Sequence, residues 1–65
     1  MIVVNGEESA VKPGTTISEL LLDIDAPARG VAVAVDSEVV PRGEWDGYTI
    51  EDDARVEVVT AVQGG

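Results

Sequence analysis

The residue types that most often perform catalysis are absent from this sequence. Its 65 residues include no histidine and no cysteine, the side chains that most often serve as general base or as activated nucleophile. Serine and threonine hydroxyls are present, but the chain offers no base to activate them. It also has no phosphate-binding loop and no dinucleotide-binding fingerprint. We therefore predict that the chain is not an enzyme and has no catalytic residues.

Two clusters of carboxylates are candidate metal ligands. Asp23 and Asp25 lie at the expected end of a helix, and Glu51-Asp52-Asp53 lies in an expected turn before a strand. A calcium loop needs regularly spaced oxygen ligands and a glycine hinge, and neither cluster has them. Zinc sites without His or Cys are unusual. We expect no metal site and no intrinsic cofactor.

The last two residues, Gly64 and Gly65, are the remaining candidates for chemistry. They follow an expected strand and have no Cβ atoms, so they form a slender tip that can enter a narrow active site. The carboxylate of Gly65 would be the modified group. Gly64, Gln63 and Val62 would present it as part of a flexible tail, residues 62–65. Chain ends are often simply disordered, so an inert tail is the alternative.

The charge of the chain excludes several classes of partner. The formal net charge is −9, and the four basic residues are scattered: Lys12, Arg29, Arg42 and Arg55. Without a basic stripe, we expect no nucleic acid partner and no binding to an anionic membrane surface. No apolar run approaches the roughly 20 residues that span a bilayer. The start lacks the features of a signal peptide, so we expect a cytoplasmic protein. The acidity indicates either a partner with a basic surface or simple solubility.

A hairpin is expected at the start of the chain. Residues 1–5 read as a strand, with Ile2 and Val4 on one face. Asn5-Gly6 is a strong hairpin signal because both residues accept a positive φ. The return strand is then expected at about residues 8–12.

One helix is expected next. Thr16 and Glu19 have the spacing of a capping box, in which each side chain bonds to the other residue's backbone N–H. An apolar stripe follows at helical spacing: Ile17, Leu20, Leu21 and Ile24. Asp25-Ala26-Pro27 ends the helix, because proline cannot continue its hydrogen-bond ladder.

Further strands are expected in the second half. Residues 31–35 alternate valine and alanine, so the valines should face the helix and the small alanines the outer side of the sheet. Val39-Val40 begins a short strand that Pro41 interrupts. Residues 41–54 are irregular and pinned to the core by Trp45, Tyr48 and Ile50. The last strand covers about residues 55–61.

This order of elements predicts an α+β fold of the β-grasp (ubiquitin-like) type. A mixed sheet of four to five strands would wrap over one helix in a single domain, residues 1–65. The first and last strands would lie side by side and parallel near the middle of the sheet.

The sequence resembles the ThiS family of thiamin-pathway sulfur carriers over essentially its whole length. The most specific part is Val39-Val40-Pro41-Arg42-Gly43-Glu44-Trp45, supported by the Leu20-Leu21 helix, the 31–35 strand and the terminal Gly64-Gly65. One departure concerns the turn before the last strand, where similar carriers often have Asp-Gly-Asp and this chain has Asp52-Asp53-Ala54. We expect this to be a turn variation that leaves the function intact.

The resemblance implies a reaction sequence performed by partner enzymes. A ThiF-like adenylyltransferase would use ATP to convert the Gly65 carboxylate into an acyl-adenylate. A sulfur donor, typically a cysteine desulfurase persulfide, would displace AMP and leave a thiocarboxylate. Thiazole synthase would then take the sulfur for the thiazole ring of thiamin.

Docking is expected on the outer face of the sheet. Val59, Ala61 and the alanine face of residues 31–35 would form a shallow apolar patch there. We interpret Trp45 as a cover for the end of the core. Arg42 is expected to clamp the 41–54 segment to a nearby carboxylate, and a direct contact of Arg42 with a partner is the alternative.

Other readings remain open from the sequence. A MoaD-like small subunit of molybdopterin synthase would use the same tail, although the short length and the Pro41-Arg42…Trp45 pattern favour thiamin. A third type of carrier would serve another sulfur pathway or conjugate to lysines. A passive β-grasp interaction module would have an inert tail.

Overall fold

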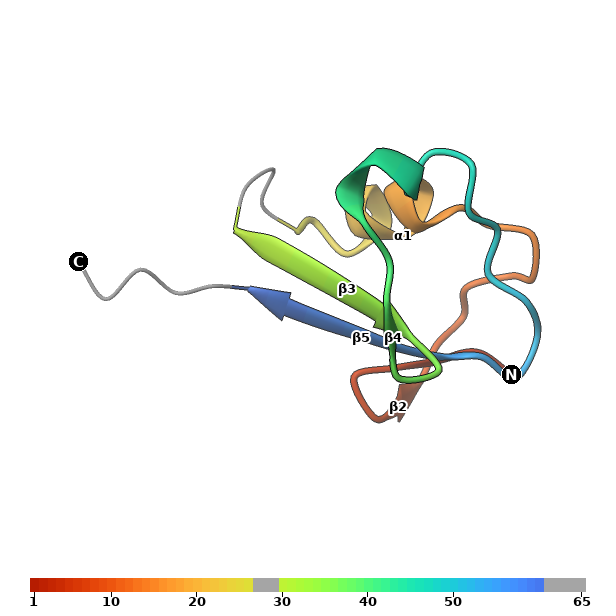
Figure 1. The fold of residues 1–65 in the computed structure, drawn as a ribbon. Helices are drawn as coiled ribbons and strands as arrows, with labels where there is room; N and C mark the ends of the chain where they lie inside the picture. Colours follow the sequence, from red (N-terminus) through yellow and green to blue (C-terminus); the bar gives the residue numbers. More distant parts are fainter. Residues whose placement is uncertain (27–29, 61–65) are drawn as a thin grey trace.

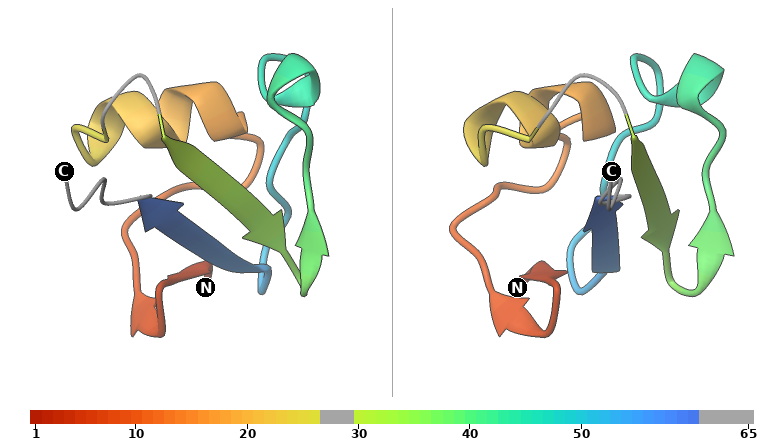
Figure 2. Two further views of the ribbon diagram at one scale, coloured as in Figure 1. Left: turned by 60° about the vertical axis from the view of Figure 1, so that its left-hand side comes forward. Right: turned by 90° about the vertical axis from the view of Figure 1, so that its left-hand side faces the viewer.

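The computed structural model describes residues 1–26 and 30–60. These residues form a five-stranded mixed sheet in the order β2-β1-β5-β3-β4, with a helix across one face (Figures 1 and 2). The elements are β1 (Val3–Val4), β2 (Glu7–Glu8), α1 (Ile17–Asp23), β3 (Val31–Val35), β4 (Glu38–Val39), the 3₁₀ turn η1 (Arg42–Glu44) and β5 (Arg55–Thr60). Strand β5 is central, parallel to β1 and antiparallel to β3. The predicted α+β sheet with parallel first and last strands is therefore confirmed. The predicted tail, residues 62–65, lies outside the described residues.

The first hairpin turns at Asn5-Gly6, as predicted, with φ angles of 52° and 82°. Because the turn has only two residues, Val4 pairs with Glu7 and Val3 with Glu8. The predicted return strand at residues 8–12 is wrong beyond Glu8. There the Ser9 hydroxyl accepts a hydrogen bond from the Val11 backbone N–H (3.1 Å), a local contact that competes with strand pairing.

Helix α1 begins with the predicted capping box. The Thr16 hydroxyl accepts a hydrogen bond from the Glu19 N–H (3.1 Å), and the Glu19 carboxylate accepts one from the Thr16 N–H (2.9 Å). The apolar stripe is confirmed for the three residues buried against the sheet, Ile17, Leu20 and Leu21. Ile24 lies at the C-cap and is 41% exposed, because the helix has ended before it can turn this side chain inward.

The helix ends by a backbone motif that the sequence pattern did not indicate. The Ala26 N–H donates to the Leu21 carbonyl (2.9 Å) and the Asp25 N–H to the Leu22 carbonyl (3.1 Å). These two bonds are those of a Schellman motif. The motif requires a left-handed residue, and Asp25 fills that position with a φ of 57°.

Replacing Asp25 by glycine should stabilise the domain. Glycine adopts the left-handed conformation without the steric cost that a Cβ imposes, which is about 1–2 kcal/mol for an ordinary residue. Part of this gain is lost to the greater freedom of glycine in the unfolded chain, so we expect a net gain of about 0.5–1 kcal/mol. Urea unfolding measures it. Leu22→Gly, within the same helix, is the control and should cost about 1 kcal/mol. A loss of stability in Asp25→Gly would contradict the prediction.

The second hairpin joins β3 to β4. Its two turn residues, Asp36 and Ser37, both have positive φ angles, 50° and 73°, the signature of a type I′ turn. This turn pairs Val35 with Glu38, so β4 begins one residue earlier than predicted and ends at Val39. Val40 instead turns inward, where it is 5% exposed and its N–H still bonds to the carbonyl of Val33 (2.9 Å).

The core lies between the sheet and α1. Its buried side chains are Ile2, Ile17, Leu20, Leu21, Val33, Val35, Val40, Trp45, Ile50, Ala54 and Val56. The predicted facing of β3 is confirmed, since Val33 and Val35 are buried while Ala32 is exposed. The irregular segment is pinned as predicted by Trp45 and Ile50, which are 9% and 0% exposed. The Trp45 indole N–H donates to the carbonyl of Val40 (2.9 Å).

The start of β1 is tied to the turn that precedes β5. The Met1 α-amino group lies 2.8 Å from the Asp53 carboxylate and 2.9 Å from that of Asp52. Asp53, in the variant turn Asp52-Asp53-Ala54, has a left-handed φ of 64°. The variant turn is therefore accommodated by a residue that tolerates this conformation better than most and that adds a contact with the Met1 amine.

This contact predicts a specific pH dependence. The hydrogen bond to the Asp53 carboxylate and, with a smaller effect, the one to Asp52 raise the pKa of the Met1 α-amino group from 8.0 to about 10. The amine's contribution to stability is therefore full below its unfolded-state pKa near 8.0 and is lost as pH rises through about 10. The bond from this amine also lowers the pKa of Asp52. The stability that Asp52 contributes is present above the usual carboxyl pKa and is lost as pH falls through the lowered pKa.

NMR titration of the Met1 α-proton measures the raised pKa. In the double variant Asp52→Asn with Asp53→Asn, the pKa of the amine should return towards its ordinary value of about 8. A wild-type amine that titrates at the same pH as in the double variant would show that the carboxylates do not hold it in solution.

Candidate functional site

The outer face of the sheet carries an apolar patch that crosses three strands. Val59 of β5 pairs directly with Ala32 of β3, and Ala34 of β3 pairs with Val39 of β4. Ala32 and Ala34 are two residues apart, so all four side chains point to the same face. Val59 is 61% exposed and Val39 is 74% exposed. We call Ala32, Ala34, Val39 and Val59 the outer sheet patch.

The structure brings only some of the predicted site residues together. Val59 lies in the outer sheet patch beside the predicted alanine face, and Val39 joins them although the sequence reading did not single it out. The signal that could have found Val39 is its place in a hairpin, where the turn sets which strand residues are directly opposite. Ala61, Val62, Gln63, Gly64 and Gly65 lie outside the described residues, so their roles stay predictions.

Arg42 and Trp45 lie on the other side of the sheet, next to the helix. The guanidinium carbon of Arg42 is 6.0 Å from the centroid of the Trp45 ring, within the range of a cation–π contact. Trp45 is buried and covers the edge of the core, as predicted. Because Ser18 and Leu21 of α1 line the same hollow as Arg42, Arg42 is separate from the outer sheet patch.

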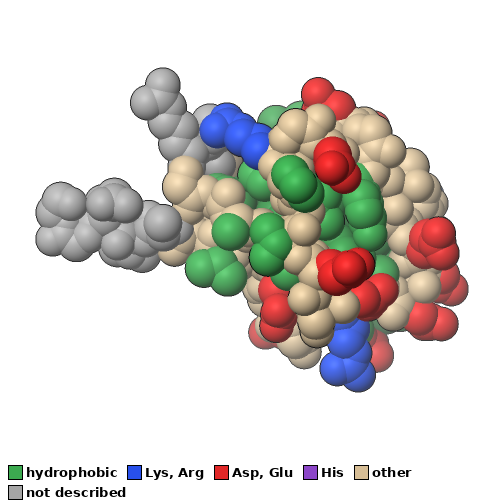
Figure 3. Space-filling model, viewed as in Figure 1, with side chains coloured by type: hydrophobic (Ala, Val, Ile, Leu, Met, Phe, Trp, Pro, Cys, Tyr) green, Lys and Arg blue, Asp and Glu red, His purple; other side chains and the backbone are tan. Residues whose placement is uncertain are grey.

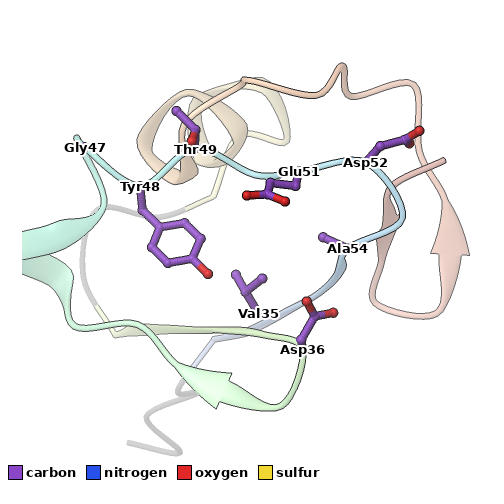
Figure 4. Close-up of a pocket in the computed structure, with 8 residues that line it drawn as sticks. All are labelled: Val35, Asp36, Gly47, Tyr48, Thr49, Glu51, Asp52 and Ala54. Atoms are coloured by element: carbon purple, nitrogen blue, oxygen red, sulfur yellow. The ribbon is translucent and has the colours of Figure 1, made fainter.

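A hollow of about 500 Å³ lies between β3 and the 47–54 segment (Figure 4). The ring of Tyr48 and the carboxylates of Asp36 and Glu51 face it, whereas Asp52 points away towards the chain start. Asp36 already accepts a hydrogen bond from the Arg55 N–H (3.0 Å). Asp36 is therefore held by the Arg55 N–H and Asp52 by the Met1 amine. We assign the hollow no ligand. Within residues 1–26 and 30–60, no group of three or more acidic side chains could hold a metal ion.

Acidic residues outnumber basic ones in the chain by 13 to 4. Figure 3 shows hydrophobic side chains over the middle of one face, with carboxylates spread around them. Such a surface attracts partners with basic patches and favours fast association with them. In the part of the chain that the structure describes, no helix has the length and apolar character needed to cross a bilayer.

The sheet order and the helix across one face define the class of protein, a β-grasp domain of the ubiquitin-like type. A crystal structure of a thiamine biosynthesis protein, ThiS, from Geobacter metallireducens has the same fold, with a TM-score of 0.83 and 33% sequence identity. The alignment covers 98% of this chain and 97% of that one. The ThiS family profile matches residues 2–65. The chain therefore belongs to the ThiS family.

Curated relatives fall into two kinds. The sulfur carrier protein ThiS of Escherichia coli is 28% identical over 64 residues, which cover 98% of this chain and 97% of the relative. Thiazole synthases of Paramagnetospirillum magneticum and Magnetococcus marinus are 31% and 34% identical over 64 residues. The chain spans only 20% of the length of each of these synthases.

Proposed function

We propose that this protein is the sulfur carrier of thiazole formation in thiamin biosynthesis. The observation that carries the proposal is the end-to-end match to the sulfur carrier of Escherichia coli, 98% of one chain on 97% of the other. The β-grasp fold supports it. The protein acts as a substrate of partner enzymes and is not itself an enzyme.

The chemistry takes place at the carboxylate of Gly65. A carboxylate is ionised at neutral pH and is a poor electrophile, so it first needs a better leaving group. A ThiF-like adenylyltransferase joins it to the AMP part of ATP and releases pyrophosphate. The partner enzyme binds the ATP that this step consumes, so the carrier needs no cofactor of its own. We also propose that the carrier is located in the cytoplasm.

Sulfur then replaces one carboxylate oxygen. The terminal sulfur of a cysteine desulfurase persulfide attacks the carbonyl carbon, the C–O bond to AMP breaks, and an acyl disulfide forms. A thiol supplies the two electrons that cleave the S–S bond and release the thiocarboxylate. The sulfur stays tethered to a protein, which raises its effective concentration at the acceptor.

Thiazole synthase is the proposed acceptor of this sulfur. Two thiazole synthases contain a region similar to this chain over 64 residues, which supports a direct association between carrier and synthase. The outer sheet patch is the proposed docking surface for the adenylyltransferase, because it is apolar, exposed and built on the strand that leads to residues 61–65. Ala61 would extend this patch.

Intact mass spectrometry tests the proposed function. The purified chain is incubated with a ThiF-like adenylyltransferase, ATP, a cysteine desulfurase, cysteine and a thiol. We expect a gain of about 16 Da, the exchange of oxygen for sulfur in an acyl-transfer reaction. The loaded carrier should then supply sulfur to thiazole synthase and not to the large subunit of molybdopterin synthase. An unchanged mass, with no adenylate, would show an inert interaction module.

A further inference from the structure

A second hollow, of about 390 Å³, lies on the helix side of the molecule between α1 and η1. We call it the helix-side hollow. Its lining includes Leu21, Leu22, Ala26, Arg42, Trp45 and Asp46. Leu21 and Trp45 are 8% and 9% exposed, so they form a largely apolar floor.

Leu22 is the exposed leucine at this hollow. It is 82% exposed, the highest value among the large hydrophobic side chains of the described residues. It lies outside the stripe that packs α1 against the sheet, so its exposure follows from its place on the helix. Together with Leu21 and Trp45, Leu22 makes the lining of this hollow largely apolar, and an apolar hollow rimmed by polar residues is typical of a surface that a partner covers.

The walls of the helix-side hollow are held in place before any partner binds. The Ser18 hydroxyl donates to the Asp46 carboxylate (2.5 Å) and its N–H to the carbonyl of Trp45 (3.3 Å). Both bonds tie α1 to the segment after η1. A preformed hollow costs little ordering when a partner binds.

Charge decides which partner fits this hollow. Asp46 and Arg42 both line it, and the exposed Asp23 and Asp25 lie at the adjoining end of α1, so among the described residues the carboxylates outnumber the single guanidinium there. With a net charge of −9, a second copy of the chain would be repelled. A partner that presents an apolar side chain beside Lys or Arg is attracted by the carboxylates and covers Leu22.

The helix-side hollow and the outer sheet patch lie on opposite sides of the sheet. The sheet separates them, because α1 and η1 lie on the face towards which Val33 and Val35 point (Figure 2), and Ala32 and Ala34 point the other way. Strand β5 ends on the side of the molecule where α1 ends (Figure 2).

From this arrangement we infer that the helix-side hollow is the docking surface of the sulfur-donating protein. The inference rests on the proposed function. An acyl-adenylate is easily hydrolysed, so the donor has to reach it while the adenylyltransferase still holds the carrier. Two proteins must then contact the carrier together, and this requires two separate surfaces. The donor presents an apolar side chain flanked by basic residues to Leu22 and Asp46.

The test compares a protein donor with a donor too small to dock. With hydrosulfide, the C–O bond of the adenylate breaks, a C–S bond forms and AMP leaves without any reductant. With a cysteine desulfurase in excess over the carrier, cysteine supplies the sulfur as a persulfide. Dithiothreitol is added only when the reaction is stopped, because from the start it would free hydrosulfide from the persulfide, and it then supplies the two electrons that cleave the acyl disulfide. The substitution is Leu22→Asp, at a surface position, and its control is Val59→Asp, which adds the same charge to the outer sheet patch. Thermal unfolding checks that both variants fold.

We expect Leu22→Asp to form adenylate and to load sulfur from hydrosulfide at rates within about twofold of wild type. Loading from the desulfurase should be at least about tenfold slower, a loss typical of a central contact residue. Val59→Asp should slow adenylation, and therefore loading from both donors. Equal loss of loading from both donors in Leu22→Asp would overturn the inference. Failure of the wild type to form adenylate would instead refute the proposed function.

Binding gives an independent readout. On addition of the desulfurase without ATP, the amide signal of Leu22 and the indole signal of Trp45 should shift in the NMR spectrum of the wild type. In Leu22→Asp the indole shift should be lost. Shifts confined to Ala32, Ala34, Val39 and Val59 would place the donor on the outer sheet patch and contradict the inference.

Discussion

Deletion of Gly65 should reduce sulfur loading to less than about 1% of wild type, because a shift of about 1 Å at a reacting centre already costs about 10²-fold. The deletion moves the terminal carboxylate by a full residue, and the new terminal group no longer reaches the adenylyltransferase's reacting phosphate. Among the described residues the last core side chain is Val56, and we expect the free energy of unfolding not to change. Intact mass after the loading reaction measures the loss.

Gly64→Trp is the companion variant, because it keeps the carboxylate and the chain length but widens the tip. If a narrow active site must admit this tip, Gly64→Trp should also fail to load sulfur. Its urea unfolding midpoint should equal that of the wild type. A Gly65 deletion that loads normally would contradict the assignment of the reacting carboxylate. Normal loading by Gly64→Trp would contradict only the requirement for a slender tip.

Leu20→Ala should lower the free energy of unfolding by about 2–5 kcal/mol, the range for a buried leucine. Leu20 is 0% exposed in a core that contains no phenylalanine and no disulfide. A domain of 65 residues has a total stability of about 3–10 kcal/mol. The substitution therefore removes a large part of the margin, and urea unfolding measures it.

The matched control for Leu20→Ala is Leu22→Ala in the same helix. Leu22 is 82% exposed, so its truncation should change stability by less than about 0.5 kcal/mol. Both substitutions replace leucine by a strong helix former, so the difference between them reports burial and not helix propensity. A cost below about 0.5 kcal/mol for Leu20→Ala, as at a surface position, would mean that α1 packs on the sheet through another face.

Because Leu22 lines the helix-side hollow, we expect it to affect partner binding. The same residue is expected to be nearly neutral for stability and costly for loading from a protein donor. Leu20 is expected to behave in the opposite way, since its side chain is enclosed by the core. The pair therefore separates stability from partner binding within one short helix.

The sequence alone determined the features that depend on local chemistry. The capping box of Thr16 and Glu19, the left-handed turn at Asn5-Gly6 and the alternation in β3 were all predicted and all found. Each depends on residues within a few positions of one another, so periodicity and turn stereochemistry are sufficient to specify it. The order of these local elements was also enough to predict the β-grasp fold.

Only the tertiary structure decided the features that depend on distant partners. The hydrogen bonds from Ser18 to Asp46 and to the Trp45 carbonyl join α1 to a segment far along the chain. The contact of the Met1 amine with Asp52 and Asp53 likewise joins segments far apart in the chain. Local patterns specify what a residue can do, whereas these contacts depend on which other segment the fold brings beside it.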